Sequence, residues 1–290
     1  MREGLIIKGY GGFYYVRSGE ETWCCRGRGR LRRERSPLPG DYVLFTPLER
    51  GEGVIESIQQ RKNVLLRPPV ANIDQVVLVV SLASPDPDLK LLNRSLVLCE
   101  LKKLGVVVCL NKIDLLEPGQ AENLADIYRK AGYSTIFTSA LYGDGLDKLH
   151  RVISGKVSVL SGPSGVGKST LLNSLDPNLS LETGEISRKL KRGKHTTRYV
   201  ELIPLCGGFI ADTPGFSSLE LPAMERTELS SCFPEMNQFS GKCRFGDCIH
   251  LDEPDCAVKK AVETGLISEA RYQYYKQFLQ EIISKERIYE

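Results

Sequence analysis

The sequence contains no apolar run long enough to cross a bilayer, and its N-terminus lacks a cleavable signal pattern. We therefore expect a soluble cytoplasmic protein with no membrane segment. There is no internal repeat, and no low-complexity tract apart from one arginine-rich stretch. The net charge of +3 is too small to indicate a nucleic-acid partner by itself. The 290 residues, 41% of them hydrophobic, suffice for two or three domains with proper cores.

The first 62 residues have hardly any room for a long helix. Short β-rich runs at 5–7, 13–16 and 42–45 alternate with turns that contain glycine or proline. This spacing predicts a small five-stranded barrel of the OB type, a class that often binds oligonucleotides. An SH3-like barrel fits the same spacing nearly as well.

An arginine-rich stretch lies within this predicted barrel. On a small barrel, clustered arginines would bind RNA phosphates, although a solvated hairpin is the alternative. Of Tyr14, Tyr15 and Trp23, we expect at least two in the barrel core, and the remainder could stack on bases. The six arginines fall within ten residues: Arg26, Arg28, Arg30, Arg32, Arg33 and Arg35.

The pattern changes after the barrel to an alternation of strands and helices. The apolar runs end in polar residues or glycine at 73–82, 105–111, 134–140 and 156–162, with helical stretches such as 91–104 and 121–132 between them. Such alternation predicts an α/β fold with a mostly parallel sheet covered on both faces, in which ligands bind at the carboxyl ends of the strands. A helical tail with a Cys/His-rich loop comes after this region. The predicted domains are 1–62, 63–221 and 222–290.

A phosphate loop matching GxxxxGK[ST] follows one of these strands and precedes a helix. Its glycines let backbone N–H groups curl around phosphate oxygens without interference from a Cβ atom. Lys168 would reach the β- and γ-phosphates, and Ser169 would bind Mg²⁺. The loop indicates a nucleoside triphosphate but not its base. We expect the nucleotide to contact Gly162, Pro163, Ser164, Gly165, Val166, Gly167, Lys168, Ser169 and Thr170.

Two segments indicate that the base is guanine. Asn111-Lys112-Ile113-Asp114 follows a buried strand, where guanine-nucleotide switches carry an NKxD segment. Its aspartate accepts hydrogen bonds from guanine N1–H and the exocyclic amine, which adenine cannot supply, so ATP would leave a costly unpaired carboxylate. Lys112 would pack along the base and Asn111 would tie the loops together. Ser139-Ala140 matches the segment whose backbone N–H meets guanine O6.

The predicted switch segments come later in the chain. In Asp212-Thr213-Pro214-Gly215, Asp212 would hold Mg²⁺ through water and the Gly215 N–H would sense the γ-phosphate. A threonine between this segment and the phosphate loop can bind Mg²⁺ only when the γ-phosphate is present, and we favour Thr197 over Thr196.

The order of the motifs is rotated, because the base-reading segments precede the phosphate loop rather than coming after it. Nucleotide binding depends on where the segments lie in space and not on their order in the chain, so the same pocket can form in the permuted chain. The chain, however, leaves the GTPase core directly after the switch segment, and movement of that segment should pull on the helical tail behind it.

The C-terminal loop carries a cluster of metal-binding residues, Cys243-x4-Cys248-x-His250-x5-Cys256. Three thiolates and one imidazole form a full tetrahedral set for Zn²⁺, and four protein ligands leave no open position, which favours a structural site. The spacing is not that of a common zinc finger, so chance is the alternative. The other cysteines outside the barrel are expected in the core: Cys99, Cys109, Cys206 and Cys232.

The rotated motif order, the N-terminal barrel and the C-terminal cluster together resemble one family, the circularly permuted ribosome small-subunit biogenesis GTPases (RsgA, also called YjeQ or YloQ). The resemblance covers essentially the whole chain, with NKID at 111–114, GPSGVGKST at 162–170, HTT at 195–197 and DTPGF at 212–216. It implies binding to the small ribosomal subunit and its rRNA late in maturation, GTP hydrolysis to GDP stimulated by the subunit, and release on hydrolysis. We expect a monomer that binds GTP or GDP, one structural Zn²⁺, and Mg²⁺ through Ser169, Thr197 and Asp212.

One position departs from the usual GTPase pattern. Many GTPases carry a water-orienting glutamine after the switch glycine, but this chain has Phe216. The resemblance suggests His195 as the substitute, acting with Lys168 and Thr197, and a solvated histidine in a basic loop is the alternative. Two other classes stay open: an RNA-binding assembly protein that uses GTP only to hold its shape, and an ATPase or small-molecule kinase.

Overall fold

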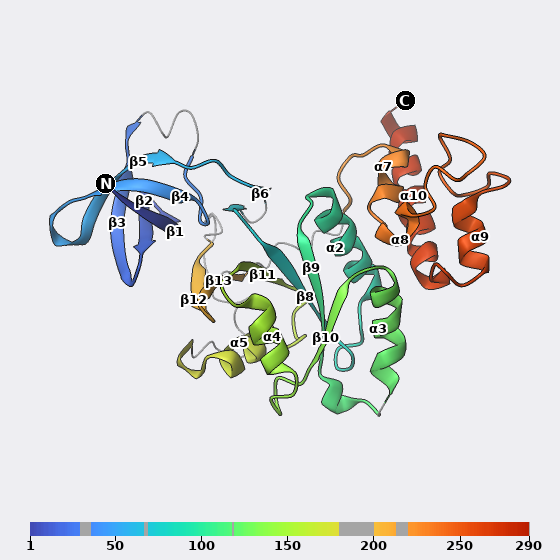
Figure 1. The fold of residues 1–290 in the computed structure, drawn as a ribbon, viewed down its shortest axis with the longest axis horizontal. Coiled ribbons are helices and arrows are strands. Elements are labelled where there is room, and N and C mark those ends of the chain that lie inside the picture. Colours follow the sequence, from blue (N-terminus) through green and yellow to red (C-terminus); the bar gives the residue numbers. More distant parts are fainter. Residues whose placement is uncertain (30–35, 67–68, 118, 180–199, 213–219, 290) are drawn as a thin grey trace. The chain divides into compact units, whose positions relative to one another are not determined.

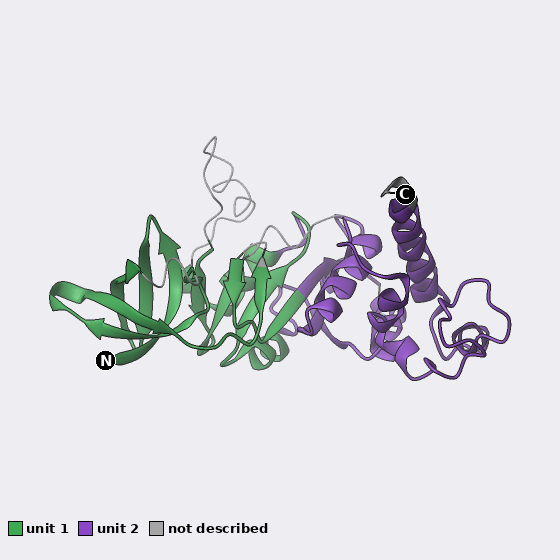
Figure 2. Cartoon of the chain, turned by 90° about the horizontal axis from the view of Figure 1, so that it is seen from above, with its two compact units in different colours: residues 1–77, 146–164, 168–216 green, residues 78–145, 165–167, 217–290 purple. Residues whose placement is uncertain are grey.

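The structure, a computed structural model, divides into two compact units, each built from several stretches of chain (Figure 2). Unit 1 comprises residues 1–77, 146–164 and 168–216, and unit 2 comprises 78–145, 165–167 and 217–290. The residues that the structure describes are 1–29, 36–66, 69–117, 119–179, 200–212 and 220–289.

Unit 1 begins with a closed barrel of five strands in the order β1-β2-β3-β5-β4 (Figure 1). All neighbouring strands pair antiparallel except β3 and β5, which are parallel. This Greek-key order confirms the OB-type barrel predicted from the sequence. The strands are β1 (Arg2–Tyr10), β2 (Phe13–Ser18), β3 (Glu21–Gly27), β4 (Tyr42–Pro47) and β5 (Glu52–Ile58), with a 3₁₀ turn at Glu49–Gly51. The core consists of Ile6, Val16, Cys25, Val43, Phe45 and Ile55.

A short hairpin, β6 (Val64–Leu66) and β7 (Pro69–Ala71), is fixed to the barrel by buried contacts. The Asn72 amide donates to the Gly40 carbonyl over 2.7 Å. Gly40 has a φ of +89°, and a Cβ there would lie 2.0 Å from the Ala71 carbonyl oxygen, so only glycine fits this close approach. Fully buried Asp41 accepts two hydrogen bonds from the Arg61 guanidinium, at 2.6 and 2.7 Å.

Six strands form the central sheet in the order β10-β9-β8-β11-β13-β12. β10 pairs parallel with β9 and β11 pairs parallel with β13, whereas β12 is antiparallel to β13. Every residue of β8 and β11 is buried, as a parallel sheet covered on both faces requires. The mostly parallel sheet predicted from the sequence is thereby confirmed. The strands are β8 (Gln75–Ser81), β9 (Gly105–Asn111), β10 (Ser134–Thr138), β11 (Val157–Ser161), β12 (Leu202–Leu205) and β13 (Gly208–Asp212).

Helices and short 3₁₀ turns alternate with these strands. In unit 2 the helix α2 begins after Asp88, whose side chain caps it by accepting from the Leu91 N–H over 2.9 Å. The helices of unit 2 in the sheet region are α2 (Leu89–Leu101) and α3 (Gln120–Lys130), and those of unit 1 are α4 (Leu146–Ile153) and α5 (Lys168–Leu175). The turns are η2 (Ile113–Leu115) and η3 (Pro177–Leu179).

Unit 2 ends in a helical region that packs on α2. Val97 of α2 belongs to the same buried cluster as Phe233, Met236 and Tyr275, so this region and the core helix share one hydrophobic interior. The helices are α7 (Arg226–Ser231), α8 (Pro234–Asn237), α9 (Ala257–Glu263) and α10 (Glu269–Tyr289), shown in orange to red in Figure 1.

A buried arginine joins three of these helices. Arg271 of α10 is 1% exposed, and its guanidinium donates two hydrogen bonds to Glu235 of α8, at 2.7 and 3.1 Å. A third bond of 2.5 Å reaches the Asn93 side-chain oxygen on α2. The guanidinium also lies 4.6 Å from the centre of the Phe233 ring. The buried charge thus has a counter-ion and an amide acceptor, and removing either ion would leave the other without its counter-ion.

We expect Arg271→Met to lower the free energy of unfolding by about 3–5 kcal/mol, because it leaves the Glu235 carboxylate buried without a counter-ion. Urea denaturation followed by circular dichroism measures this loss. The matched control is Arg129→Met, which removes an arginine that forms ion pairs on the surface of α3 and should leave the unfolding midpoint close to wild type. Equal midpoints for the two variants would contradict the role given to Arg271.

Candidate nucleotide and metal sites

The loop after β9 is connected to the phosphate loop by the side chain of Asn111. Asn111 is fully buried, and its amide nitrogen donates to the Val166 carbonyl over 2.8 Å. Its side-chain oxygen accepts from the Thr138 hydroxyl at 3.0 Å and from the Ala140 N–H at 3.3 Å. One amide therefore joins three segments that lie far apart in the chain.

Lys112 makes a second connection to the phosphate loop. Its ammonium group donates to the Gly165 carbonyl over 2.8 Å and also to the Ser84 carbonyl. At Gly167, which has a φ of +96°, a Cβ would lie 2.4 Å from the Asn111 amide nitrogen. Both the backbone conformation and the space therefore require glycine at this position of the loop.

Asp114 presents an exposed carboxylate beside these connections. The hydroxyl of buried Ser139 donates to one of its oxygens over 2.5 Å. Ala140 comes directly after Ser139, and its N–H lies within hydrogen-bonding distance of Asn111. Unit 2 thus brings together the predicted residues of the NKxD and Ser-Ala segments. The Asp114 carboxylate, a hydrogen-bond acceptor, is held in one orientation by Ser139.

In unit 1 the phosphate loop lies between β11 and α5, the strand–loop–helix context that the motif requires. The Lys168 ammonium group donates to the carbonyls of Gly162 and Pro163, at 2.8 and 2.9 Å. The loop leads into the N-terminus of α5, and helix N-termini are sites that favour phosphate because of their backbone N–H groups and the helix dipole.

Several predicted residues lie outside the described residues. They are His195, Thr196, Thr197, Gly215, Phe216 and the arginines at 30, 32, 33 and 35. For Asp212, only its backbone position at the end of β13 is described.

The predicted metal ligands converge in unit 2. The ligand atoms of Cys243, Cys248, His250 and Cys256 all lie within 4.8 Å of one another. The sulfurs of Cys243 and Cys256 are 3.8 Å apart, and they lie 3.6 and 3.4 Å from His250 Nδ1. Tetrahedral Zn²⁺, with bonds of about 2.3 Å to sulfur and about 2.0–2.1 Å to nitrogen, gives separations of about 3.8 and 3.6 Å. The four residues therefore fit a zinc ion.

The protonation chemistry of this cluster suits a metal as well. Burial lowers the pKa of His250, which favours the neutral imidazole that binds metal ions. Burial raises the pKa of Cys248 to about 12, so a metal ion that binds there displaces a proton.

The other cysteines mostly agree with the prediction. Cys99, Cys109 and Cys232 are buried, and burial raises the pKa of Cys109 to about 12. Cys206 does not agree: it lies half-buried in the turn between β12 and β13, where tight chain reversal keeps it out of the core.

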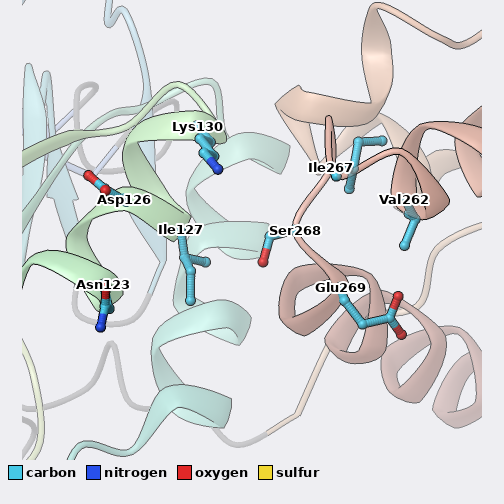
Figure 3. A pocket seen from close by; sticks show the side chains of 9 residues that line it. Asn123, Asp126, Ile127, Lys130, Val262, Ile267, Ser268 and Glu269 are labelled. Atoms are coloured by element: carbon cyan, nitrogen blue, oxygen red, sulfur yellow. The ribbon is translucent and has the colours of Figure 1, made fainter.

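A separate groove of about 320 Å³ lies in unit 2 between α3 and the α9–α10 turn (Figure 3). None of the predicted nucleotide or metal residues line it, so it is distinct from both sites. Its lining mixes charged, polar and apolar side chains: Asn123, Asp126, Ile127, Lys130, Val262, Gly265, Ile267, Ser268 and Glu269. Among the helices that the structure describes, none is both long and apolar enough to cross a membrane.

Comparison with protein-family models gives two matches that together span the barrel and the central sheet. A model described as RsgA GTPase matches residues 58–222, and one described as RsgA N-terminal domain matches residues 3–55. The chain belongs to the RsgA GTPase family. Its membership agrees with the resemblance seen in the motifs, and it decides for a GTP hydrolase over an ATPase, a kinase or a non-catalytic scaffold.

Full-length relatives support membership of the RsgA family. The chain is 49% identical to a protein of Moorella thermoacetica over 98% of this chain and 99% of the relative. It is 50% identical to one of Geobacillus thermodenitrificans over 99% of both chains. Both relatives are named small ribosomal subunit biogenesis GTPase RsgA.

Two solved structures show the permuted RsgA fold. YloQ, described as a circularly permuted GTPase, has a TM-score of 0.81 and 41% identity, covering 98% of this chain and 96% of that one. YjeQ from Thermotoga maritima has a TM-score of 0.85 and 38% identity, covering 97% and 98%. The circularly permuted GTPase fold predicted from the motif order is confirmed.

Proposed function

We propose that this RsgA-family GTPase binds the small ribosomal subunit, assists its late maturation, and hydrolyses GTP to GDP and phosphate with stimulation by the subunit. The main support is that one chain contains both the guanine-nucleotide loops in permuted order and a five-stranded barrel. Relatives of the same length, about half identical, carry the small-subunit biogenesis name. We further propose a cytoplasmic monomer with domains at 1–62, 63–221 and 222–290.

In this proposal the phosphates bind the loop at 162–170. Lys168 exchanges its two carbonyl partners for the β- and γ-phosphates, because charged phosphate oxygens are stronger acceptors than neutral carbonyls. Ser169, Thr197 and Asp212 hold Mg²⁺, which neutralises developing phosphate charge when bound. The Gly215 N–H senses the γ-phosphate.

We propose that Asp114 recognises guanine and that the Lys112 stem packs along the base. The Ala140 N–H exchanges its 3.3 Å bond to Asn111 for the guanine O6. The Ser139 hydroxyl occupies one Asp114 oxygen and so fixes the orientation of the carboxylate toward the base. Asn111 and Lys112, through their bonds to Val166 and Gly165, hold this acceptor in register with the phosphate loop.

Asp114→Asn should lower GTP affinity by about 10- to 150-fold for each charge-assisted hydrogen bond that is lost. The same variant should gain affinity for xanthosine triphosphate, because xanthine offers a C2 carbonyl to the new amide donor. Equilibrium titration with labelled GTP, xanthosine triphosphate and ATP measures both changes. Asp144→Asn, an exposed aspartate in the neighbouring loop, is the control and should bind GTP normally. A wild-type protein that prefers ATP would rule out guanine recognition.

Hydrolysis requires a group that orients the attacking water, and the phenyl ring of Phe216 cannot do this. We propose that His195 supplies it, since an imidazole can accept a proton from water and this histidine comes two residues before Thr197, the threonine expected to bind Mg²⁺. The catalytic group is then His195, Lys168 and Thr197.

Adding purified small subunits should raise GTP turnover, and His195→Ala should remove most of that stimulation while leaving GTP affinity intact. General-base groups contribute about 10²- to 10⁴-fold, which sets the size of the expected loss. Phosphate release under single-turnover conditions is the measurement, and His150→Ala, an exposed histidine on α4, is the matched control. Turnover that does not respond to subunits would contradict the proposed function, whereas unchanged turnover in His195→Ala would contradict only the role of this residue.

The outer face of the barrel supplies a surface for RNA. Tyr10, Phe13 and Arg26 are register partners across β1, β2 and β3, so their side chains share one face. The next row along this face is Lys8, Tyr15 and Cys24. The Arg26 guanidinium lies 4.5 Å from the centre of the Phe13 ring.

Exposed aromatic rings beside cations are the features that bind single-stranded RNA bases and phosphates. Tyr10, Phe13 and Tyr15 are 59%, 37% and 38% exposed, whereas Tyr14 and Trp23 pack against the barrel core. We therefore propose this face, together with the arginine-rich stretch, as the rRNA contact.

Tyr15→Ser should weaken binding to the small subunit by about 5- to 150-fold, the equivalent of about 1–3 kcal/mol for one stacked base. Filter binding or sedimentation at two salt concentrations measures it. Tyr42→Ser removes an aromatic ring of similar exposure, 44%, from β4 and is the matched control. If both variants bind equally well, the β1–β2–β3 face is not the contact.

We also propose that Cys243, Cys248, His250 and Cys256 bind one structural Zn²⁺. The separations between their ligand atoms support a closed tetrahedral site, and all four positions around the ion would be filled by protein.

A further inference from the structure

The loop that carries the proposed zinc ligands has an unusual backbone at its only histidine. His250 has a φ of +58°, in the left-handed region that residues with a Cβ atom rarely adopt. The side chain of His250 is nevertheless buried, and its Nδ1 faces the sulfurs of Cys243 and Cys256. Something outside the ligand set must therefore hold this backbone in place.

Glu253 accepts hydrogen bonds from the backbone N–H groups of the two residues on either side of His250. One carboxylate oxygen accepts from the Ile249 N–H over 2.6 Å, and the other accepts from the Leu251 N–H over 2.7 Å. Burial by itself would raise the pKa of Glu253, but backbone N–H groups, those of Ile249 and Leu251 among them, lower it overall. Both oxygens accept from the backbone and the carboxylate also meets the Cys248 thiol, so Glu253 supports the loop directly beside the ligand set.

Two tyrosines of α10 bind backbone carbonyls of the same short segment. The Tyr272 hydroxyl donates to the His250 carbonyl over 2.7 Å, and the Tyr275 hydroxyl donates to the Ile249 carbonyl. Both rings are buried, and they stack with their centres 6.2 Å apart. The hydroxyls are therefore fixed by packing before any metal binds.

Cys256 shows by contrast why His250 needs this support. Cys256 caps α9, where its sulfur accepts from the Lys259 N–H over 3.5 Å, so regular helix geometry places this ligand. His250 lies in no helix or strand. Its position is determined by side chains from Glu253 and α10.

We propose that Glu253, Tyr272 and Tyr275 are positioning residues for the metal centre: they fix the left-handed backbone of His250 so that Nδ1 meets the three sulfurs. The proposal rests on the zinc site proposed above. Groups that orient a metal ligand in this way contribute about 10- to 100-fold to metal affinity.

The test measures zinc affinity of the full-length protein by competition with a chromophoric chelator. Glu253→Gln should weaken zinc binding by about 10- to 100-fold, because an amide offers one acceptor to two N–H groups and turns its NH₂ toward the other. Tyr272→Phe and Tyr275→Phe, which remove only a hydroxyl, should each weaken it in the same direction. The matched controls are Asp252→Asn, an exposed carboxylate next to Glu253, and Tyr274→Phe, a tyrosine between the two; both should bind zinc as wild type does.

Cobalt(II) substitution distinguishes positioning from ligation and from general destabilisation. All variants should keep the absorption bands of tetrahedral thiolate–imidazole coordination, with only the affinity reduced, and their GTP affinity should be unchanged. Variants that bind zinc as tightly as their controls would overturn the proposal, as would a changed cobalt spectrum in Glu253→Gln. If Glu253→Gln does not fold, the two tyrosine variants decide the matter alone. A wild-type protein that binds no zinc would instead contradict the metal site itself.

Discussion

The nucleotide loops of unit 2 depend on one buried side chain, the amide of Asn111. In this fold the rotated order separates the NKxD segment from the phosphate loop by two helices and two strands, so covalent connection cannot fix their spacing. Asn111 fixes this spacing instead. Its side-chain nitrogen donates to the Val166 carbonyl, and its side-chain oxygen accepts from the Thr138 hydroxyl and the Ala140 N–H. An amide is suited to this place since it donates and accepts at once, and a buried donor or acceptor without a partner would cost about 1–3 kcal/mol.

The C-terminal helices are likewise fastened to the core by polar groups as well as by apolar packing. Arg271 bridges Glu235 and Asn93, and its neighbours Tyr272 and Tyr275 donate to backbone carbonyls of the loop that carries the proposed metal ligands. A single turn of α10 thus contacts the core helix on one side and the ligand-bearing loop on the other. Burying a charge for this purpose is costly unless the ion is paired and hydrogen-bonded, and here the guanidinium has both a counter-ion and an amide acceptor.

Functional residues could be predicted from the sequence wherever they lie close together in the chain. The phosphate loop, the NKxD segment and the Cys/His cluster are short patterns whose residues must lie side by side, so their spacing identifies them. The barrel type was also predictable from turn spacing, although only the β3–β5 parallel pairing separates OB from SH3-like topology. Residues that act across long separations left no such signal: Arg271 looks like any charged helical residue, and Glu253 like one acid among several in an acidic loop. Their roles depend on burial and on partners far away in the chain.

The rotated order gives the helical region two attachments to the nucleotide core. One is covalent, since α7 comes after the Asp212–Gly215 segment with only a short connection between them. The other is the Asn93–Arg271 bond on α2, a helix that begins just after the loop whose Ser84 carbonyl accepts from Lys112. Because Lys112 also bonds Gly165 of the phosphate loop, a rearrangement of that loop on nucleotide binding would act on α2 as well as on the switch. In an unpermuted GTPase a domain appended to the chain terminus would have no covalent link at the switch, so the permutation itself supplies the covalent attachment of the C-terminal helices.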